Sequence, residues 1–127
     1  WAVDSAVKLR GVSLSGEYFF RLLNGFKAQP SAATIDSLFD HGGLLEGGVF
    51  FIPSTLEAFA RTSFVTGQFG SGGEYGGGMN WYPKKSRGFR FTVEVLQIQN
   101  SPAQNLLTGY RAGESGTLFQ LQGFADF

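Results

Sequence analysis

Charged and apolar residues alternate along most of this 127-residue sequence. Alternation with a period of two places successive side chains on opposite faces of a β-strand. Helical periodicity is nearly absent, and 19 glycines and 14 phenylalanines favour strands and turns over helices. The pattern predicts an all-β fold of one domain, 1–127, with seven strands at 2–9, 12–22, 44–52, 56–66, 73–82, 89–98 and 117–127.

The predicted connections alternate in length along the chain. The shorter ones are Arg10-Gly11, Pro53-Ser54 and 83–88. The longer ones are 23–43, 66–72 and 99–116, with a short helix expected at 31–39. If the strands form an antiparallel up-and-down sheet, every second connection lies at the same end. Short turns at one end and long loops at the other are typical of outer-membrane β-barrels.

Charged residues keep to one face of the predicted strands. Two charges share a parity in each of four strands: Asp4 with Lys8, Glu17 with Arg21, Glu57 with Arg61, and Arg90 with Glu94. The alternate positions carry no charge in any strand. We therefore expect a polar face that lines a pore, formed by Lys8, Arg10, Glu17, Arg21, Glu46, Glu57, Arg61, Glu74, Asn80, Arg90, Glu94, Gln120 and Gln122.

Aromatic residues lie toward the ends of the opposite, apolar face, and smaller apolar residues lie between them. A barrel in lipid places aromatic rings at both water interfaces, around an apolar band about 25 Å tall. Strands of nine to eleven residues, such as those expected here, are about long enough to cross that band. The expected girdle residues are Tyr18, Phe20, Phe51, Phe64, Tyr75, Trp81, Phe89, Phe119 and Phe127.

Seven strands are too few for a complete barrel, because single-chain bacterial barrels have even numbers of strands from eight upward. An open sheet would also leave two unpaired edges in lipid. The amphipathic segment that ends at Phe127 is similar to the assembly signal of outer-membrane proteins. We therefore expect a transmembrane β-barrel of which this chain supplies the C-terminal portion, with outer-membrane lipid as a partner.

The strand register also predicts one pair of charges. If Pro53-Ser54 is a two-residue turn, Ile52 pairs with Thr55 and Phe51 with Leu56. Counting outward from this turn places Glu46 opposite Arg61 on the polar face. Such a pair would belong to a charged belt in the pore or would be an ordinary surface ion pair.

One segment resembles a known family, the phosphate-selective porins O and P of Gram-negative outer membranes. It is Gly73-Glu74-Tyr75-Gly76-Gly77-Gly78-Met79-Asn80-Trp81-Tyr82-Pro83, similar to that family's strand leading into an Asn-Trp-Tyr turn. Segments 10–21 and 118–127 resemble it more loosely. The resemblance implies a homotrimeric, water-filled channel and suggests anionic solutes such as phosphate. The mixture of acids and bases on the polar face argues against anion specificity.

Other classes of function find little support in the sequence. Ten basic and ten acidic residues give zero formal net charge, which argues against nucleic-acid binding. Cysteine is absent and His41, expected in a loop, is the single histidine, so no metal site, cofactor or enzymatic activity is predicted. The alternative is a secreted soluble β-sandwich that binds carbohydrate or a protein partner through exposed aromatics such as Trp81 and Tyr82.

Overall fold

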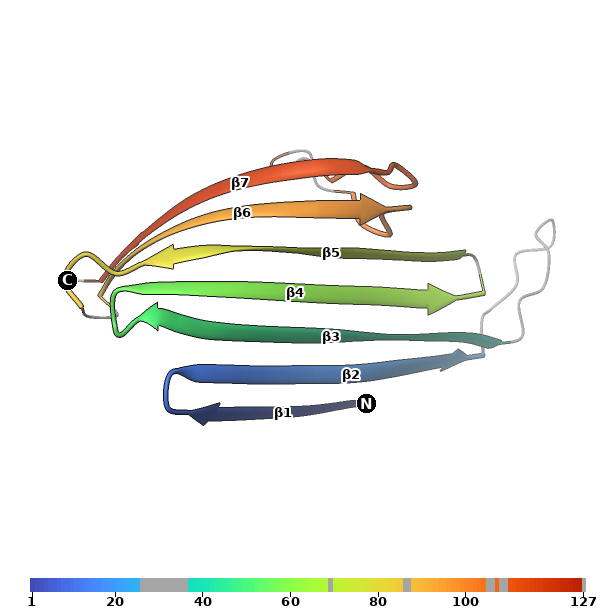
Figure 1. Cartoon of the computed structure of the whole chain (residues 1–127). Helices are drawn as coiled ribbons and strands as arrows, with labels where there is room; N and C mark the ends of the chain where they lie inside the picture. Colours follow the sequence, from blue (N-terminus) through green and yellow to red (C-terminus); the bar gives the residue numbers. More distant parts are fainter. Residues whose placement is uncertain (26–36, 69, 86–87, 105–106, 108–109, 127) are drawn as a thin grey trace.

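The computed structural model describes residues 1–25, 37–68, 70–85, 88–104, 107 and 110–126. These residues form seven strands: β1 (Ala2–Leu9), β2 (Val12–Asn24), β3 (Ser37–Ile52), β4 (Leu56–Gly67), β5 (Gly70–Trp81), β6 (Phe89–Gln99) and β7 (Gly116–Ala125). They make one sheet in the order β1-β2-β3-β4-β5-β6-β7, and each pair of neighbours is antiparallel (Figure 1). The all-β, up-and-down prediction is confirmed.

The tight hairpin between β1 and β2 forms as predicted. Arg10 has a φ of 47° and Gly11 a φ of 85°. A two-residue type I′ turn requires positive φ at both central residues, and its twist matches that of the flanking strands. Leu9 consequently pairs with Val12, which sets the register of the whole hairpin.

The hairpin between β3 and β4 differs from the prediction near its turn. Ile52 pairs with Leu56 rather than Thr55, and the register shifts between Phe50 and Ile52. Phe51 therefore has no pairing partner, as expected for a β-bulge. Beyond the bulge the register follows the predicted count, and Glu46 lies opposite Arg61.

The strands extend further than predicted at the other end of the sheet. Residues 37–39, which were expected to be helical, are the start of β3, whereas 31–36 lie outside the described residues. The predicted glycine-rich loop 66–72 is mostly strand, since Gly67 pairs with Gly70 and Val65 with Gly72. The expected difference between short turns and long loops therefore fails at β4–β5.

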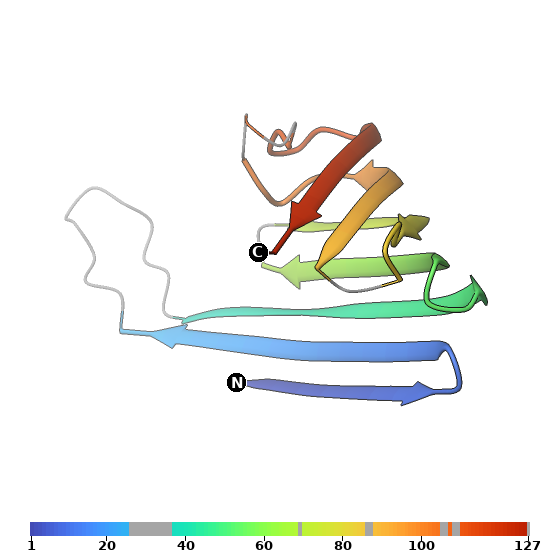
Figure 2. The same ribbon diagram turned by 90° about the vertical axis from the view of Figure 1, so that its left-hand side faces the viewer.

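The sheet curls sharply between β5 and β6. Figure 2 shows β6 and β7 inclined steeply to the flatter part formed by β1 to β3. A Cβ built on Gly76 would lie 2.0 Å from the carbonyl oxygen of Val95, and one on Gly78 would lie 2.1 Å from that of Val93. Only glycine permits so close an approach of two backbones, so these residues form the corner of the sheet.

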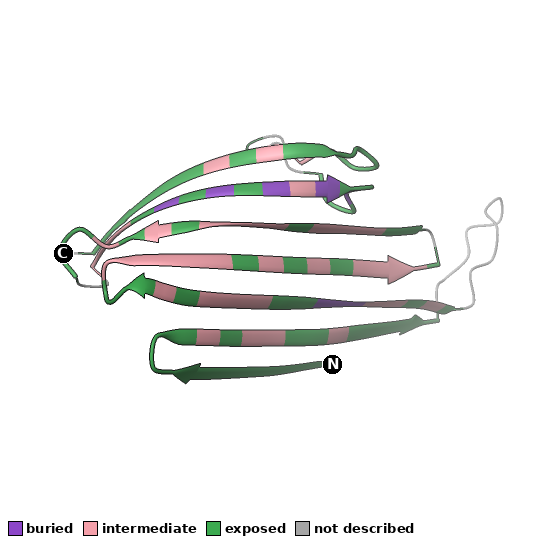
Figure 3. Ribbon diagram, viewed as in Figure 1, coloured by how far each residue is buried: buried purple, intermediate pink, exposed green. Residues whose placement is uncertain are grey.

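Burial follows the curl rather than a central core. Along β6 the residues on the concave side are buried while their neighbours are exposed (Figure 3). Among the described residues, Leu96 and Ile98 are the only buried hydrophobic ones. Most other large apolar side chains stand exposed on the convex side, including Leu121 at 82%.

The glycine corner yields a prediction for stability. Replacing Gly76 by Ala places a methyl group against backbone that cannot move aside, so the free energy of unfolding should fall by about 1–3 kcal/mol. The control is Gly47→Ala in β3, where the nearest heavy atom would be 3.7 Å away. Urea titrations of the complete protein measure both changes. Equal losses in the two variants would contradict the role assigned to Gly76.

Candidate functional site: the charged face of the sheet

Every Asp, Glu, Lys and Arg of the seven strands lies on one face of the sheet. Cross-strand partners share a face, so the register pairs trace this charged face through all six pairings. The opposite face is called the apolar face. The charged face carries seven acidic and four basic residues: Asp4, Glu17, Asp40, Glu46, Glu57, Glu74 and Glu94, with Lys8, Arg21, Arg61 and Arg90.

The predicted pore-lining residues lie on this face with one exception. Arg10 belongs to the β1–β2 turn and not to a strand. Asp40 joins the face although its segment was expected to be a loop, and it forms an ion pair with Arg21. The residues on the face as predicted are Lys8, Glu17, Arg21, Glu46, Glu57, Arg61, Glu74, Asn80, Arg90, Glu94, Gln120 and Gln122.

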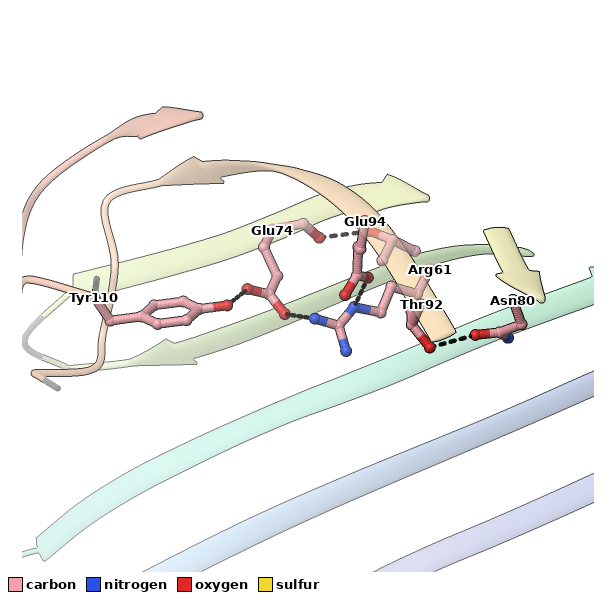
Figure 4. Close-up of polar contacts among 7 residues, drawn as sticks. Arg61, Glu74, Asn80, Thr92, Glu94 and Tyr110 are labelled. Atoms are coloured by element: carbon pink, nitrogen blue, oxygen red, sulfur yellow. Dashed lines mark hydrogen bonds and ion pairs between the residues drawn. The ribbon is translucent and has the colours of Figure 1, made fainter. Parts of the chain in front are cut away.

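A cluster of three charged residues occupies the concave centre of the charged face (Figure 4). Arg61 Nε lies 2.8 Å from Glu94 Oε1, and Arg61 Nη2 lies 3.8 Å from Glu74 Oε1. Arg61 is on β4 and Glu94 on β6, so this contact passes over β5. It can do so because the β5 partners of Arg61 and Glu94 are Gly76 and Gly78, which have no side chains.

Glu46 is opposite Arg61 in register but forms no ion pair with it. The guanidinium of Arg61 turns toward Glu74 and Glu94 instead. No cation lies within ion-pair distance of the half-buried Glu46 in the described part of the chain. The expected register was correct and the expected partner was wrong, because the curl brings β6 closer to Arg61 than adjacency in the sheet suggests.

Described residues of the connection between β6 and β7 lie over this cluster. Tyr110 donates a hydrogen bond of 2.5 Å from its hydroxyl to Glu74 Oε2. Ser101 is 3% exposed and holds the base of the connection through its backbone. Its carbonyl oxygen accepts a hydrogen bond from Gly113 N at 2.8 Å, and its N–H donates to Glu114 O at 2.9 Å. A cavity of about 230 Å³ remains beneath the connection, lined by residues that include Val65, Gly72, Ile98, Pro102 and Tyr110.

A second polar network lies nearer the tight turns. Glu57 Oε2 accepts hydrogen bonds from Asn80 Nδ2 at 3.0 Å and from the Tyr82 hydroxyl at 3.1 Å. Thr92 in turn donates to Asn80 Oδ1 at 2.7 Å. Both donors to Glu57 are neutral groups.

The predicted girdle residues that the structure describes are on the apolar face, apart from the bulge residue Phe51. Phe127 lies outside the described residues. The strand register does not separate these aromatic residues into two groups, one near each end of the strands. Phe119, for example, is level with Val95, Gly77 and Ala60 across the sheet. The other members are Tyr18, Phe20, Phe64, Tyr75, Trp81 and Phe89.

His41 is in β3 on the apolar face and not in a loop. Its Nδ1 lies 3.1 Å from the Tyr18 hydroxyl, and its ring stacks on Phe39 at a centroid distance of 5.6 Å. It therefore lies on the opposite side of the sheet from every strand carboxylate. The described residues hold no group of three or more potential metal ligands.

Tyr110 provides a pH-dependent prediction. Burial, and after it the hydrogen bond to Glu74, raises the pKa of Tyr110 from 10.0 to about 12. Because the folded pKa exceeds the unfolded one, the contact contributes fully below about pH 10 and is lost as pH rises through about 12. Tyrosinate absorbance, taken as the difference between the native protein and Tyr110→Phe, should titrate near pH 12. A midpoint near 10 would refute the contact.

Comparison with known proteins leaves the chain without an assigned family. No family model matches it, and no curated protein or solved structure does.

Proposed function

We propose that this chain is part of an outer-membrane β-barrel porin, with its apolar face against lipid and its charged face lining a water-filled channel. The channel would pass small hydrophilic solutes by passive diffusion. One observation carries the proposal, namely the complete separation of strand charges from a broad, exposed apolar face. The porin O and P resemblance of 73–83 and a homotrimeric assembly belong to the same proposal.

The exposure of the apolar face is far beyond what a soluble surface carries. Leu121 is 82% exposed, Phe119 75% and Val3 70%, and each of the other five strands also exposes at least one large apolar residue on this face, to a smaller extent. Soluble monomers rarely expose contiguous apolar patches of more than a few hundred Å². Lipid satisfies such a face without a second layer of protein, whereas water does not.

The alternation within single strands supports the same arrangement. In β6, Phe91, Val93 and Val95 are exposed, while Thr92, Glu94 and Leu96 between them are buried. Barrels in outer membranes alternate in this way because one side of each strand meets lipid and the other meets the lumen. The sheet is also curved with its charged face on the concave side, which is the sense that a channel requires.

The soluble β-sandwich is the competing function. A sandwich buries the apolar faces of two sheets against each other. The described residues form one sheet, whose apolar face has no second layer on it. In addition, the predicted binding surface is divided, because Trp81 is on the apolar face and Tyr82 hydrogen-bonds to Glu57 on the charged face. The division of Trp81 and Tyr82 between the two faces therefore supports the porin over this alternative.

Within the described residues, no helix is long and apolar enough to span a membrane. The edges of the sheet matter more for the proposal. Among the described pairings, β1 pairs only with β2 and β7 only with β6. Exposed edges in hydrocarbon would leave backbone groups unsatisfied, so the proposal requires further strands to close the barrel.

Conductance tests the function directly. The complete protein, purified in detergent and added to a planar lipid bilayer, should produce stepwise increases in current carried by K⁺ and Cl⁻. The control is the same protein after irreversible heat denaturation, which should produce none. If the folded protein fractionates without detergent and never conducts, the porin assignment is wrong.

Neighbouring residues of β7 test the two faces. Leu121→Arg places a charge in lipid and should lower the free energy of unfolding in vesicles by about 2–4 kcal/mol. Gln120→Arg, one residue away on the charged face, should cost far less because its side chain meets water. Reversible urea unfolding in lipid measures both variants. Similar losses would contradict the assignment of the faces.

A further inference from the structure

We propose that the charged face makes this pore favour cations, and that Glu46 is a specificity-determining residue. This inference rests on the proposed function and departs from the anionic solutes that the family resemblance suggests. Its basis is that two of the three arginines on the charged face are paired with carboxylates, so that unpaired acids outnumber unpaired bases on the wall.

Two of the three arginines on the charged face have carboxylate partners, Arg61 in the middle of β4 and Arg21 on β2, level with the β4–β5 turn. Arg61 is held between Glu74 and Glu94, at 3.8 Å and 2.8 Å. Arg21 is paired with Asp40, whose side chain is 17% exposed. An arginine that shares its charge with a neighbouring carboxylate presents little net field to a passing anion. Neither residue therefore acts as a free cationic site on the wall.

The other two basic residues lie toward the tight-turn end of the sheet. Lys8 is exposed near the end of β1. Arg90 is near the start of β6, with its guanidinium 5.9 Å from the centroid of the Phe124 ring. Lys8 is level in register with Glu94, with four strands between them across the sheet. Within the described residues neither Lys8 nor Arg90 forms an ion pair, so two unpaired bases face four unpaired acids.

The carboxylates that remain are not neutralised in this way. Asp4, Glu17, Glu46 and Glu57 form no ion pair within the described part of the chain. Glu57 accepts hydrogen bonds from Asn80 and Tyr82 and from no cationic side chain. Acidic side chains along a pore wall lower the energy of a permeating cation and raise that of an anion.

Glu46 is the best placed of these carboxylates to act on a solute. It lies on the charged face in the middle of β3, with Ser15 opposite it on β2 and Arg61 on β4. Because Gly76 and Gly78 let Arg61 reach across to Glu94, the natural partner of Glu46 is drawn away from it. The corner of the sheet thus leaves Glu46 without an ion-pair partner, two strands away from the corner on the flatter part of the wall.

The zero-current potential in a gradient of KCl tests the inference, with the complete protein in a planar bilayer. The native channel should be more permeable to K⁺ than to Cl⁻. Glu46→Gln should lower the permeability ratio about twofold, because a single charge acting across a few ångströms of water changes an ion's energy by roughly the thermal energy. Glu46→Asp keeps the charge and should leave the ratio unchanged.

A second variant guards against misfolding of the first. Gln120→Glu adds a carboxylate to the same face on β7 and should raise the ratio. Channels that favour Cl⁻, or a ratio that Glu46→Gln and Gln120→Glu both leave unchanged, would overturn the inference while the porin function stands. A folded native protein that never conducts would overturn both.

Discussion

The fold depends on a register that holds across six strand pairs, with one shift at the Phe51 bulge. Because side chains alternate with a period of two, a slip of one residue in any pair would move that strand's charges to the apolar face. Under the proposed function, charged side chains on that face would lie in lipid, which would destabilise the barrel. The Arg10-Gly11 turn and the bulge at Phe51 matter for this reason, since each fixes the register of a hairpin.

The glycines of β5 have a different role from those of the turns. Gly76 and Gly78 hold extended backbone, and what they contribute is the space of a missing side chain. That space permits the sheet to bend, and it also clears the path from Arg61 to Glu94. Curvature and electrostatics are therefore coupled at one corner, where a single added methyl group would disturb both.

Most of the fold could be predicted from the sequence, because the alternation of polar and apolar residues indicates both where a strand lies and which face of the sheet each side chain is on. The strand ends could not, since Asp40-His41-Gly42-Gly43 and Gly70-Ser71-Gly72-Gly73 have loop-like composition. Their glycines serve close backbone approach instead: a Cβ on Gly72 would lie 2.0 Å from Asn100 O. Propensity cannot separate this use of glycine from flexibility.

The sequence predicted which residues belong to the candidate site, but it did not predict which of them contact one another. Parity places Glu46, Arg61, Glu74 and Glu94 on one face, but the partner of Arg61 depends on the bend of the sheet, which no pairwise register contains. Tyr110 was missed altogether. No local pattern marks a tyrosine in a long connection as a hydrogen-bond donor to a strand 36 residues earlier.

The contact between Tyr110 and Glu74 also orders events during folding. The β1–β2, β3–β4, β4–β5 and β5–β6 hairpins close short stretches of chain, so these strand pairs can form by local contacts that cost little loop entropy. The Tyr110 hydrogen bond joins residues 36 apart and needs both β5 and the base of the last connection in place. The connection can therefore settle on the wall only after the hairpins beneath it exist, which makes its docking a late step of assembly.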